Sequence, residues 1–301
     1  MASSHHHNTK PNKRNLFISI VLNAGITLTE FIGGILSNSL ALISDAVHNL
    51  SDTLAITISY IAMLAGNKKS NIKKTYGYKR IEILAALFNA VVLVAISLYL
   101  FYEAYQRFLN PEPIGTKLMF IVATIGLAGN LISLLLLHKD SSHNLNVKAA
   151  YLHLFGDTLS SVGVIIGSVL IYFYNITWID PLLTVIIGII ILRGTWGIIK
   201  ETTDILMQAS PGNLDIPEVK KQLEHHPEIK NIHHIHSWRL NDNIIHFQCH
   251  AELKNNLKIK DADKVRLELE KILQSDFGIG HITIQIESDS CHEKSTINKG
   301  L

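Results

Sequence analysis

Long apolar stretches, separated by short polar segments, fill roughly the first two-thirds of the chain. A helix needs about 20 mostly apolar residues to cross roughly 30 Å of hydrocarbon. Helices buried in the core of a large soluble protein would show charged outer faces, and these stretches contain few charges. The pattern therefore predicts a polytopic α-helical membrane domain at residues 15–203, with six transmembrane helices at 15–36, 40–66, 81–107, 117–138, 149–174 and 178–199.

Lysine and arginine gather in alternate loops, and loops rich in these residues stay in the cytoplasm. They precede the first helix, fill the loop at 67–80, flank the loop between the fourth and fifth helices, and follow the sixth helix. The opposite loops offer only Arg107 and Lys117, at helix ends. Both termini are therefore expected in the cytoplasm, with residues 1–14 as an N-terminal tail. Its run His5–His7 is either a tag remnant or a native metal-gathering tail.

From about residue 204 the pattern becomes that of a small folded domain. Helical spacing is expected at 216–225 and 260–274, and strands at 232–240, 244–253 and 282–286, with a hairpin turn at Asp242–Asn243. This order predicts an α+β domain at 204–288 with its helices on one sheet face. The other face is polar and carries histidines. A second copy of the domain could cover it, which favours a homodimer. Residues 289–301 are expected to form a flexible tail.

The composition agrees with a membrane protein and excludes other classes. The chain is 48% hydrophobic and only 17% charged, whereas an average soluble domain is about 25% charged. A formal net charge of +2 gives no basic field for binding phosphates, so no nucleic-acid partner is expected. Two cysteines, Cys249 and Cys291, do not make the disulfide framework of a small secreted protein.

Two of the predicted spans contain the same ionisable motif. His48 and Asp52 lie four residues apart in one span, and His153 and Asp157 repeat the spacing in another. Residues four apart share one helix face, so each imidazole stacks beside its carboxylate. The predicted topology places the two motifs on oppositely directed helices, as in an inverted repeat with a binding site between its halves.

Four ionisable groups within the hydrocarbon must meet each other or a cation. A single Asp costs roughly 2.5–3.5 kcal/mol at the centre of a spanning helix. Two imidazoles and two carboxylates supply a tetrahedral N2O2 set that suits zinc, whereas magnesium and calcium prefer cages of oxygen. The alternative is that these side chains only hydrogen-bond between helices. Glu30, Asn23 and Asn89 are interpreted in that second way.

The segment Ser44–Asp52 resembles the signature of the cation diffusion facilitators, in their zinc-type, CzcD-like branch. The resemblance continues through residues 75–78 and 80–86, His153 and Asp157, and in the tail through 233–238 and 281–285, and it covers about residues 15–288. It implies a homodimeric exporter of divalent metal driven by proton antiport. It also implies six helices in the bacterial cytoplasmic membrane, followed by a cytoplasmic ferredoxin-like domain.

The resemblance also implies roles for individual residues. His48, Asp52, His153 and Asp157 match the transport site, and Asp45, one turn earlier, is expected to support the ligands or line the access path. His236, His250, His281 and Glu287 match regulatory zinc positions, with His234 and Cys291 nearby. Exposed histidines that merely solubilise the sheet face are the alternative. Arg80 and Asp204 are expected to pair between the domains, unless they form only a solvated surface pair. The loop at 67–80 lacks histidine, so no metal site is expected there.

Zinc is thus expected as the transported substrate and as a regulatory ligand, with cadmium or cobalt as alternative substrates. Metal ligands must be deprotonated, so protons and zinc compete for the same atoms. An intramembrane hydrolase is disfavoured because the sequence lacks His-Glu-x-x-His. A channel would favour weak, multi-site passage rather than a strong four-ligand site. A metal sensor would need only the tail.

Overall fold

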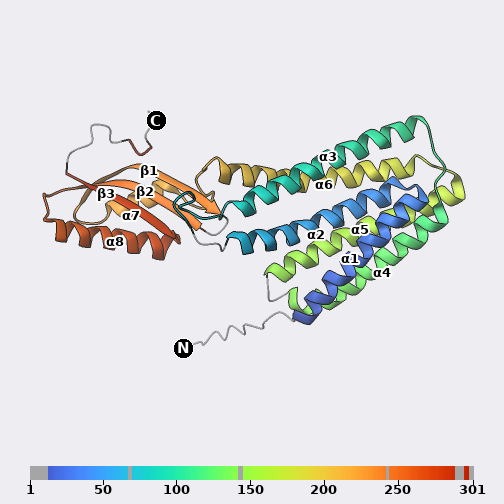
Figure 1. The fold of residues 1–301 in the computed structure, drawn as a ribbon, viewed down its shortest axis with the longest axis horizontal. Coiled ribbons are helices and arrows are strands. Elements are labelled where there is room, and N and C mark those ends of the chain that lie inside the picture. Colours follow the sequence, from blue (N-terminus) through green and yellow to red (C-terminus); the bar gives the residue numbers. More distant parts are fainter. Residues whose placement is uncertain (1–12, 67–69, 142–144, 242–243, 289–294, 298–301) are drawn as a thin grey trace. The chain divides into compact units, whose positions relative to one another are not determined.

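The structure, a computed structural model, describes residues 13–66, 70–141, 145–241, 244–288 and 295–297 (Figure 1). It divides the chain into two units. The first joins Met1–Ile58 with Phe88–Ile199, and the second joins Ser59–Leu87 with Lys200–Leu301. Six long helices run through them: α1 (Lys13–Ser37), α2 (Leu40–Gly66), α3 (Ile81–Leu109), α4 (Thr116–Ser141), α5 (Leu145–Tyr174) and α6 (Ile179–Leu206).

The six predicted spans agree with these helices to within a few residues at most ends. The largest difference is at α6, which continues seven residues beyond the predicted end at 199 and reaches Leu206. Apolar character ends near Lys200, but a helix needs no apolar residues to continue into water. The apolar window marks the depth of the membrane, and backbone hydrogen bonding decides where the helix stops.

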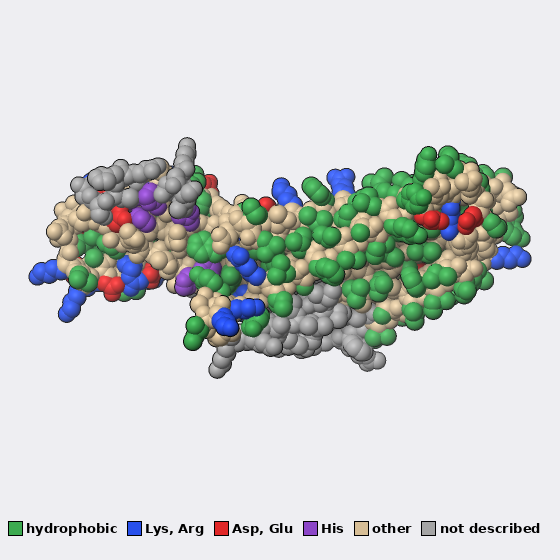
Figure 2. Space-filling view, turned by 45° about the horizontal axis from the view of Figure 1, so that its top comes forward, with side chains coloured by type: hydrophobic (Ala, Val, Ile, Leu, Met, Phe, Trp, Pro, Cys, Tyr) green, Lys and Arg blue, Asp and Glu red, His purple; other side chains and the backbone are tan. Residues whose placement is uncertain are grey.

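The surface of the helices is apolar. Side chains such as Leu36, Phe88 and Leu135 are at least two-thirds exposed, and Figure 2 shows hydrophobic side chains covering much of the helical surface. Within the described residues, four helices are long and apolar enough to cross a membrane, and Val21–Ser37 is a shorter apolar helix. The chain is therefore an integral membrane protein.

Close helix packing builds the interior of the first unit. The buried residues Leu42, Leu93 and Ile187 belong to one cluster that draws on α2 to α6. Gly33 of α1 lies against Val122 of α4, where an added Cβ would clash with a valine methyl. Small residues of this kind let membrane helices approach closely and so bring their polar side chains within reach of one another.

The C-terminal part contains a three-stranded sheet in the order β1 (Ile229–Asn241), β2 (Ile244–Leu253), β3 (His281–Glu287). β1 and β2 are antiparallel, while β2 and β3 are parallel and are joined by the crossover helix α8 (Ile259–Phe277). Asp215 caps the N-terminus of α7 (Ile216–Glu224), where its carboxylate accepts the Glu218 N–H, and Gly278, with φ 65°, caps the C-terminus of α8. This confirms the predicted α+β domain.

The two helices pack on one face of the sheet. Leu223 of α7, Phe247 of β2 and Leu269 of α8 are almost fully buried in one core. The predicted turn at Asp242–Asn243 lies outside the described residues.

One extra residue in β1 changes which side chains share a face. His233 lies opposite His250, and His236 lies opposite Gln248, so three residues of β1 span two of β2. This is a β-bulge, and His234 within it has φ 48°. Part of the predicted C-terminal tail also forms backbone hydrogen bonds with β1 at the bulge. The Ser295 and Thr296 carbonyls accept the N–H groups of His234 and Ile235 at 3.2 and 2.8 Å.

Candidate metal centre

The motifs of α2 and α5 form two imidazole–carboxylate pairs, each within a single helix. His48 Nε2 lies 3.7 Å from Asp52 Oδ2 on α2, and His153 Nε2 lies 3.5 Å from Asp157 Oδ2 on α5. Four-residue spacing produces this stacking in any regular helix. The periodicity of the sequence alone therefore predicts each half of the site.

Tertiary packing joins the two halves. His153 Nε2 lies 3.0 Å from Asp52 Oδ2, and His48 Nε2 lies 3.9 Å from Asp157 Oδ1. The two imidazole rings are 5.5 Å apart between centroids. Zinc bonds of 2.0–2.2 Å in a tetrahedron require ligand atoms about 3.4 Å from one another. The four separations lie on both sides of that value. Ligand atoms of His48, Asp52 and His153 lie within 4.8 Å of one another and could hold an ion, whereas Asp157 approaches His48 through Oδ1 and His153 through Oδ2.

One of the four side chains is buried, and the other three are only partly withdrawn from solvent. Asp157 is 3% exposed, whereas the side chains of His48, Asp52 and His153 retain between about a quarter and over a third of their exposure. A cavity of about 380 Å³ reaches three of the groups, His48, His153 and Asp157. Apolar residues of α5 and α6, including Leu152 and Leu183, form its opposite wall. An ion that enters this cavity meets polar ligands on one side only.

Buried polar groups surround the site without belonging to it. Asp45, 1% exposed, lines the cavity and accepts a hydrogen bond of 2.8 Å from the Ser160 hydroxyl. The Asn49 amide, next to His48, donates to Glu30 of α1 at 3.1 Å. Asn89 of α3 donates to Ser51 Oγ at 3.1 Å. These contacts are interhelical, as the sequence suggested for Glu30 and Asn89, and they restrict how α2 can rotate.

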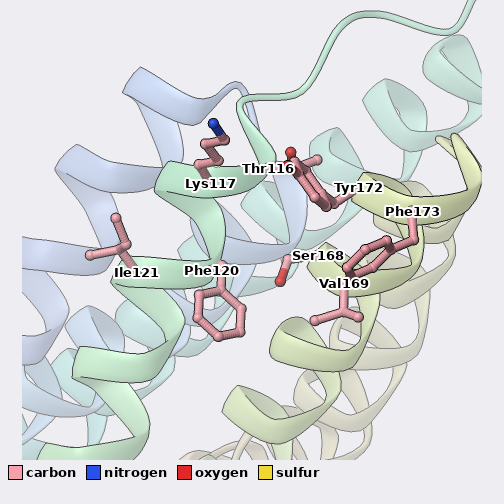
Figure 3. Close-up of a pocket in the computed structure, with 8 residues that line it drawn as sticks. All are labelled: Thr116, Lys117, Phe120, Ile121, Ser168, Val169, Tyr172 and Phe173. Atoms are coloured by element: carbon pink, nitrogen blue, oxygen red, sulfur yellow. The ribbon is translucent and has the colours of Figure 1, made fainter.

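A second hollow, of similar volume, lies between α4 and α5 (Figure 3). Phe120, Val169 and Phe173 line it, and the Lys117 amine points away from their rings. Its lining contains no imidazole or carboxylate. It therefore lacks the usual protein ligands of a metal ion, and the cavity between α2, α5 and α6, which His48, His153 and Asp157 line, remains the candidate site of the first unit.

The histidine-bearing face of the sheet contains a second cluster of possible ligands. Ligand atoms of His233, His234 and His250 all lie within 4.8 Å of one another. Glu287 joins them, with Oε1 2.6 Å from His250 Nδ1 and Oε2 3.3 Å from His233 Nε2. We call these four residues the sheet cluster.

The sheet cluster differs from the predicted regulatory set. His250, Glu287 and His234 are brought together, but His236 and His281 are not part of the cluster. His236 lies opposite Gln248, two residues along β2 from His250. His281 lies opposite His246, with the two rings 4.6 Å apart. Cys291 lies outside the described residues.

His233 is the ligand candidate that the sequence pattern missed. Simple alternation places it on the opposite face from His234 and His236, and the bulge in β1 reverses that parity. The pair of adjacent histidines at 233–234 was the available signal. His233 is fully buried, and this burial lowers the pKa of its imidazole below the usual value. Its neutral form, which is the form that binds metal, is favoured as a result.

The other end of the same sheet face is aromatic. His246 is 3% exposed. Its ring stacks on that of Trp238, with 5.2 Å between the ring centroids, and the Tyr76 ring contacts it edge-on at a centroid distance of 5.3 Å. Burial and the neighbouring His281 lower the pKa of His246. Underneath, on the core face, burial raises the pKa of the Cys249 thiol to about 12.

The ion pairs found within the described part of the chain do not include the predicted pair between Arg80 and Asp204, which stays a prediction. Among the described residues, the ion pair at this end of α6 joins Glu201 to Arg239 of β1, at 2.9 Å. Glu201 lies three residues before Asp204, so the two acids share part of one helix face. Sequence spacing does not distinguish which of them meets a base.

Comparisons with known proteins agree with both parts of the structure. Residues 16–207 match the model of the cation efflux transmembrane domain, and residues 211–289 match that of the cation efflux protein cytoplasmic domain. The chain is 39% identical to the cadmium, cobalt and zinc/H(+)-K(+) antiporter of Bacillus subtilis (strain 168), over 97% of this chain and 94% of that protein. It is 38% identical to the cation efflux system protein CzcD of Alcaligenes sp. (strain CT14), over 97% and 92%.

A further relative is the zinc transporter ZitB of Escherichia coli (strain K12), 36% identical over all of this chain and 97% of that protein. These proteins are named as transporters and antiporters of metal cations, and none of the three names describes an enzyme. Both halves of the fold and nearly the full length of the chain are covered by the matches. The chain therefore belongs to the cation efflux family of membrane metal transporters.

Proposed function

We propose that the protein exports zinc from the cytoplasm in exchange for protons, and that His48, Asp52, His153 and Asp157 hold the ion in transit. One observation carries the proposal. Two imidazoles and two carboxylates from α2 and α5 converge with separations of 3.0–3.9 Å. This set of two nitrogen and two oxygen donors matches the number and type of ligands that tetrahedral zinc takes.

Protons drive the release of zinc because they compete for the ligand atoms. Zinc binds neutral imidazole, and free imidazole titrates near pH 6.5, so modest changes of pH alter its availability. A protonated His153 next to Asp52 forms an ion pair at 3.0 Å instead of a ligand set. His48 and His153 are the proposed carriers of the exchanged protons.

Zinc is the proposed principal substrate, with cadmium and cobalt as alternatives. The names of the relatives include all three metals. Two carboxylate oxygens make the site harder than a thiolate site, and cadmium is softer than zinc. The donor set therefore favours zinc and cobalt over cadmium.

The proposed location is the bacterial cytoplasmic membrane, with both termini in the cytoplasm. Lysines at 68, 69, 73, 74 and 79 lie in the loop between α2 and α3, and the positive-inside rule assigns that loop to the cytoplasm. The proposed boundaries are those of the sequence, a membrane domain at 15–203 and a cytoplasmic domain at 204–288. The cytoplasmic domain is the proposed surface of homodimerisation.

A regulatory zinc ion is proposed for the sheet cluster. His233, His234, His250 and Glu287 offer three imidazoles and one carboxylate, which is a suitable zinc set. Binding there would report cytoplasmic zinc to the transporter. The predicted set with His236 and His281 is replaced here by His233 and His234, because those two share the bulge opposite His250.

The rival functions fit the geometry less well. A hydrolase needs a carboxylate free to act as general base, and both carboxylates lie among the ligands. A passive channel would be blocked by an ion held by four ligands unless something displaced it. Exchange with protons supplies that displacement.

Zinc-driven proton movement in sealed vesicles tests the proposal. Vesicles that contain the wild-type protein and a pH-sensitive dye should show proton movement when zinc is added. Asp157→Ala should abolish the signal. The matched control is His138→Ala, which also removes an imidazole from a long helix. His138 lies on α4 beside Tyr151 and is not one of the four proposed ligands. An unimpaired signal from Asp157→Ala would reject the proposed site.

A further inference from the structure

The start of α2 is capped by a carboxylate from another helix. Asp180 lies in the first turn of α6. Its carboxylate accepts hydrogen bonds from Ser39 Oγ at 2.6 Å, from the Leu40 N–H at 2.8 Å and from the Ala41 N–H at 3.3 Å. The next free N–H group, that of Leu42, donates to Ser39 Oγ at 3.3 Å. The first N–H groups of α2, which no intrahelical carbonyl can satisfy, are thus shared between Asp180 and Ser39.

This contact is fully buried. Asp180 and Ser39 are both 0% exposed. A buried carboxylate is stable only where hydrogen bonds or positive charge compensate it. The positive ends of two helix dipoles, those of α2 and α6, meet at Asp180 and supply part of that compensation.

The cap links the two halves of the proposed transport site. α5 ends at Tyr174 and α6 begins at Ile179, so a short connection makes α5 and α6 one hairpin. Asp180 therefore fixes α2 to the hairpin that carries His153 and Asp157. His48 lies eight residues after Leu40, which is about 12 Å along a regular helix.

The direction of the contact also sets the rotation of α2. The cap engages the N–H groups of two consecutive residues, Leu40 and Ala41, at one point on α6. Shifting α2 by a single residue turns it by about 100°, which would carry the face with His48 and Asp52 away from α5. Loss of the cap leaves this rotation to apolar packing and to the hydrogen bonds that Asp45, Asn49 and Ser51 make further along α2.

The turn before α2 is held separately. Asn38 has φ 55°, and Arg107 of α3 donates to its carbonyl at 2.6 Å and to its Oδ1 at 2.7 Å. The Asn38 amide donates to Glu112 at 2.9 Å. Arg107 and Glu112 therefore hold the turn itself, whereas Asp180 holds the helix that follows it.

We infer that Asp180 is a positioning residue for metal selection, whose carboxylate sets the placement of His48 and Asp52 relative to His153 and Asp157. This inference rests on the proposed function, since it assigns the metal site to those four residues. The cap governs how tightly zinc is held and how well it is distinguished from cadmium. It does so without contacting the ion.

The test measures kcat and KM for zinc and for cadmium in proteoliposomes. Asp180→Ala should raise KM for zinc at least tenfold and reduce the preference for zinc over cadmium. Asp180→Asn, which keeps one acceptor oxygen and the same shape, should have a smaller effect in the same direction. Ser39→Ala should resemble Asp180→Asn. Glu112→Gln, at the exposed carboxylate beside the turn, is the matched control and should leave KM and the preference unchanged.

A merely structural role predicts a different result. The variants would then lose active protein and kcat while KM and the metal preference stayed at wild-type values, and this outcome would overturn the inference. If Asp180→Ala does not fold, Asp180→Asn and Ser39→Ala decide the question. Asp157→Asn is measured in parallel. If Asp157→Asn leaves zinc transport unchanged, the proposed transport site fails. If Asp157→Asn abolishes zinc transport while the Asp180 and Ser39 variants keep the wild-type KM, only the role of Asp180 is rejected.

Discussion

The His153 imidazole and the Asp52 carboxylate lie 3.0 Å apart, although 101 positions separate them and they belong to different helices. Of the four contacts in the candidate site this is the shortest. It places one ligand of α2 directly against one ligand of α5. Of the four proposed ligands, Asp52 should therefore be the one whose removal lowers the zinc affinity of the site most.

Asp52→Asn should lower zinc affinity at the transport site at least a hundredfold. The amide is neutral, and its nitrogen cannot accept the metal, so one anionic ligand disappears while the side-chain volume stays the same. Isothermal titration of the purified protein in detergent measures this, with His138→Ala as the control. To isolate the transport site, His250→Ala is included in the background of every protein compared. Wild-type affinity in Asp52→Asn would contradict the assignment.

The sheet cluster should bind one zinc ion per chain, in addition to any zinc ion held at the transport site. His233→Ala and His250→Ala should each remove this ion, because each deletes one of the converging ligands. His236→Ala is the matched control in the same strand, since His236 lies opposite Gln248 outside the cluster. Zinc stoichiometry by elemental analysis after exhaustive dialysis distinguishes these proteins. Equal stoichiometry in His233→Ala and His236→Ala would refute the sheet cluster as a metal site.

Acid should destabilise the cytoplasmic domain partly through His246. Its pKa is lowered in the folded state by burial and by His281. The unfolded chain then binds more protons than the folded one, so stability is complete above the unfolded pKa, near 6.5, and falls as the pH drops below it. His246→Phe keeps an aromatic ring against Trp238 but cannot be protonated. It should lose less stability than the wild type between pH 7.5 and pH 5.5.

Denaturant unfolding with a chelator present checks this prediction. Trp178→Phe and Trp196→Phe leave Trp238 as the sole tryptophan reporter, because the chain has three tryptophans. Buried His233 titrates in the same direction, so the comparison is the difference between His246→Phe and its parent. An identical loss in both proteins would show that His246 contributes nothing to the acid sensitivity.

Cys249 should resist alkylation in the folded protein. Its side chain is 1% exposed, and burial raises the pKa of its thiol to about 12, so almost no thiolate is present at pH 8. In a Cys291→Ser background, iodoacetamide should react at least about 100-fold more slowly with the native chain than with the chain in guanidinium. Fast modification of the native protein would mean that the core face of β2 is accessible.

The sequence predicted those features that depend on local periodicity. Six apolar stretches identify the helices because crossing a membrane demands about 20 apolar residues whatever the neighbours are. The spacing of His48 with Asp52 and of His153 with Asp157 determines each half of the site, because both members lie on one helix. The opposite direction of the two helices followed from the order of the spans, because the second and fifth crossings of a six-span chain run in opposite directions, and the basic loops added which side is cytoplasmic.

Features that depend on the arrangement of distant segments were not predicted. The bulge at His234 reverses the faces of β1 and brings in His233, and regular alternation contains no signal for it. Asp180 lies in a predicted span like any other residue, and only the folded arrangement of α2 and α6 makes it a cap. The same limit applies to the ion pair of Glu201 at the end of α6, because it depends on the position of Arg239 in β1.

Zinc flux driven by an imposed pH gradient tests the central claim most directly. Proteoliposomes loaded with a zinc-sensitive dye, with the interior more acidic than the medium, should accumulate zinc through the wild-type protein. Reversing the gradient should reverse the net flux. Asp157→Asn should abolish both fluxes, while His138→Ala should retain them. Zinc movement that ignores the gradient, or that persists in Asp157→Asn, would contradict proton-coupled transport through the four ligands of α2 and α5.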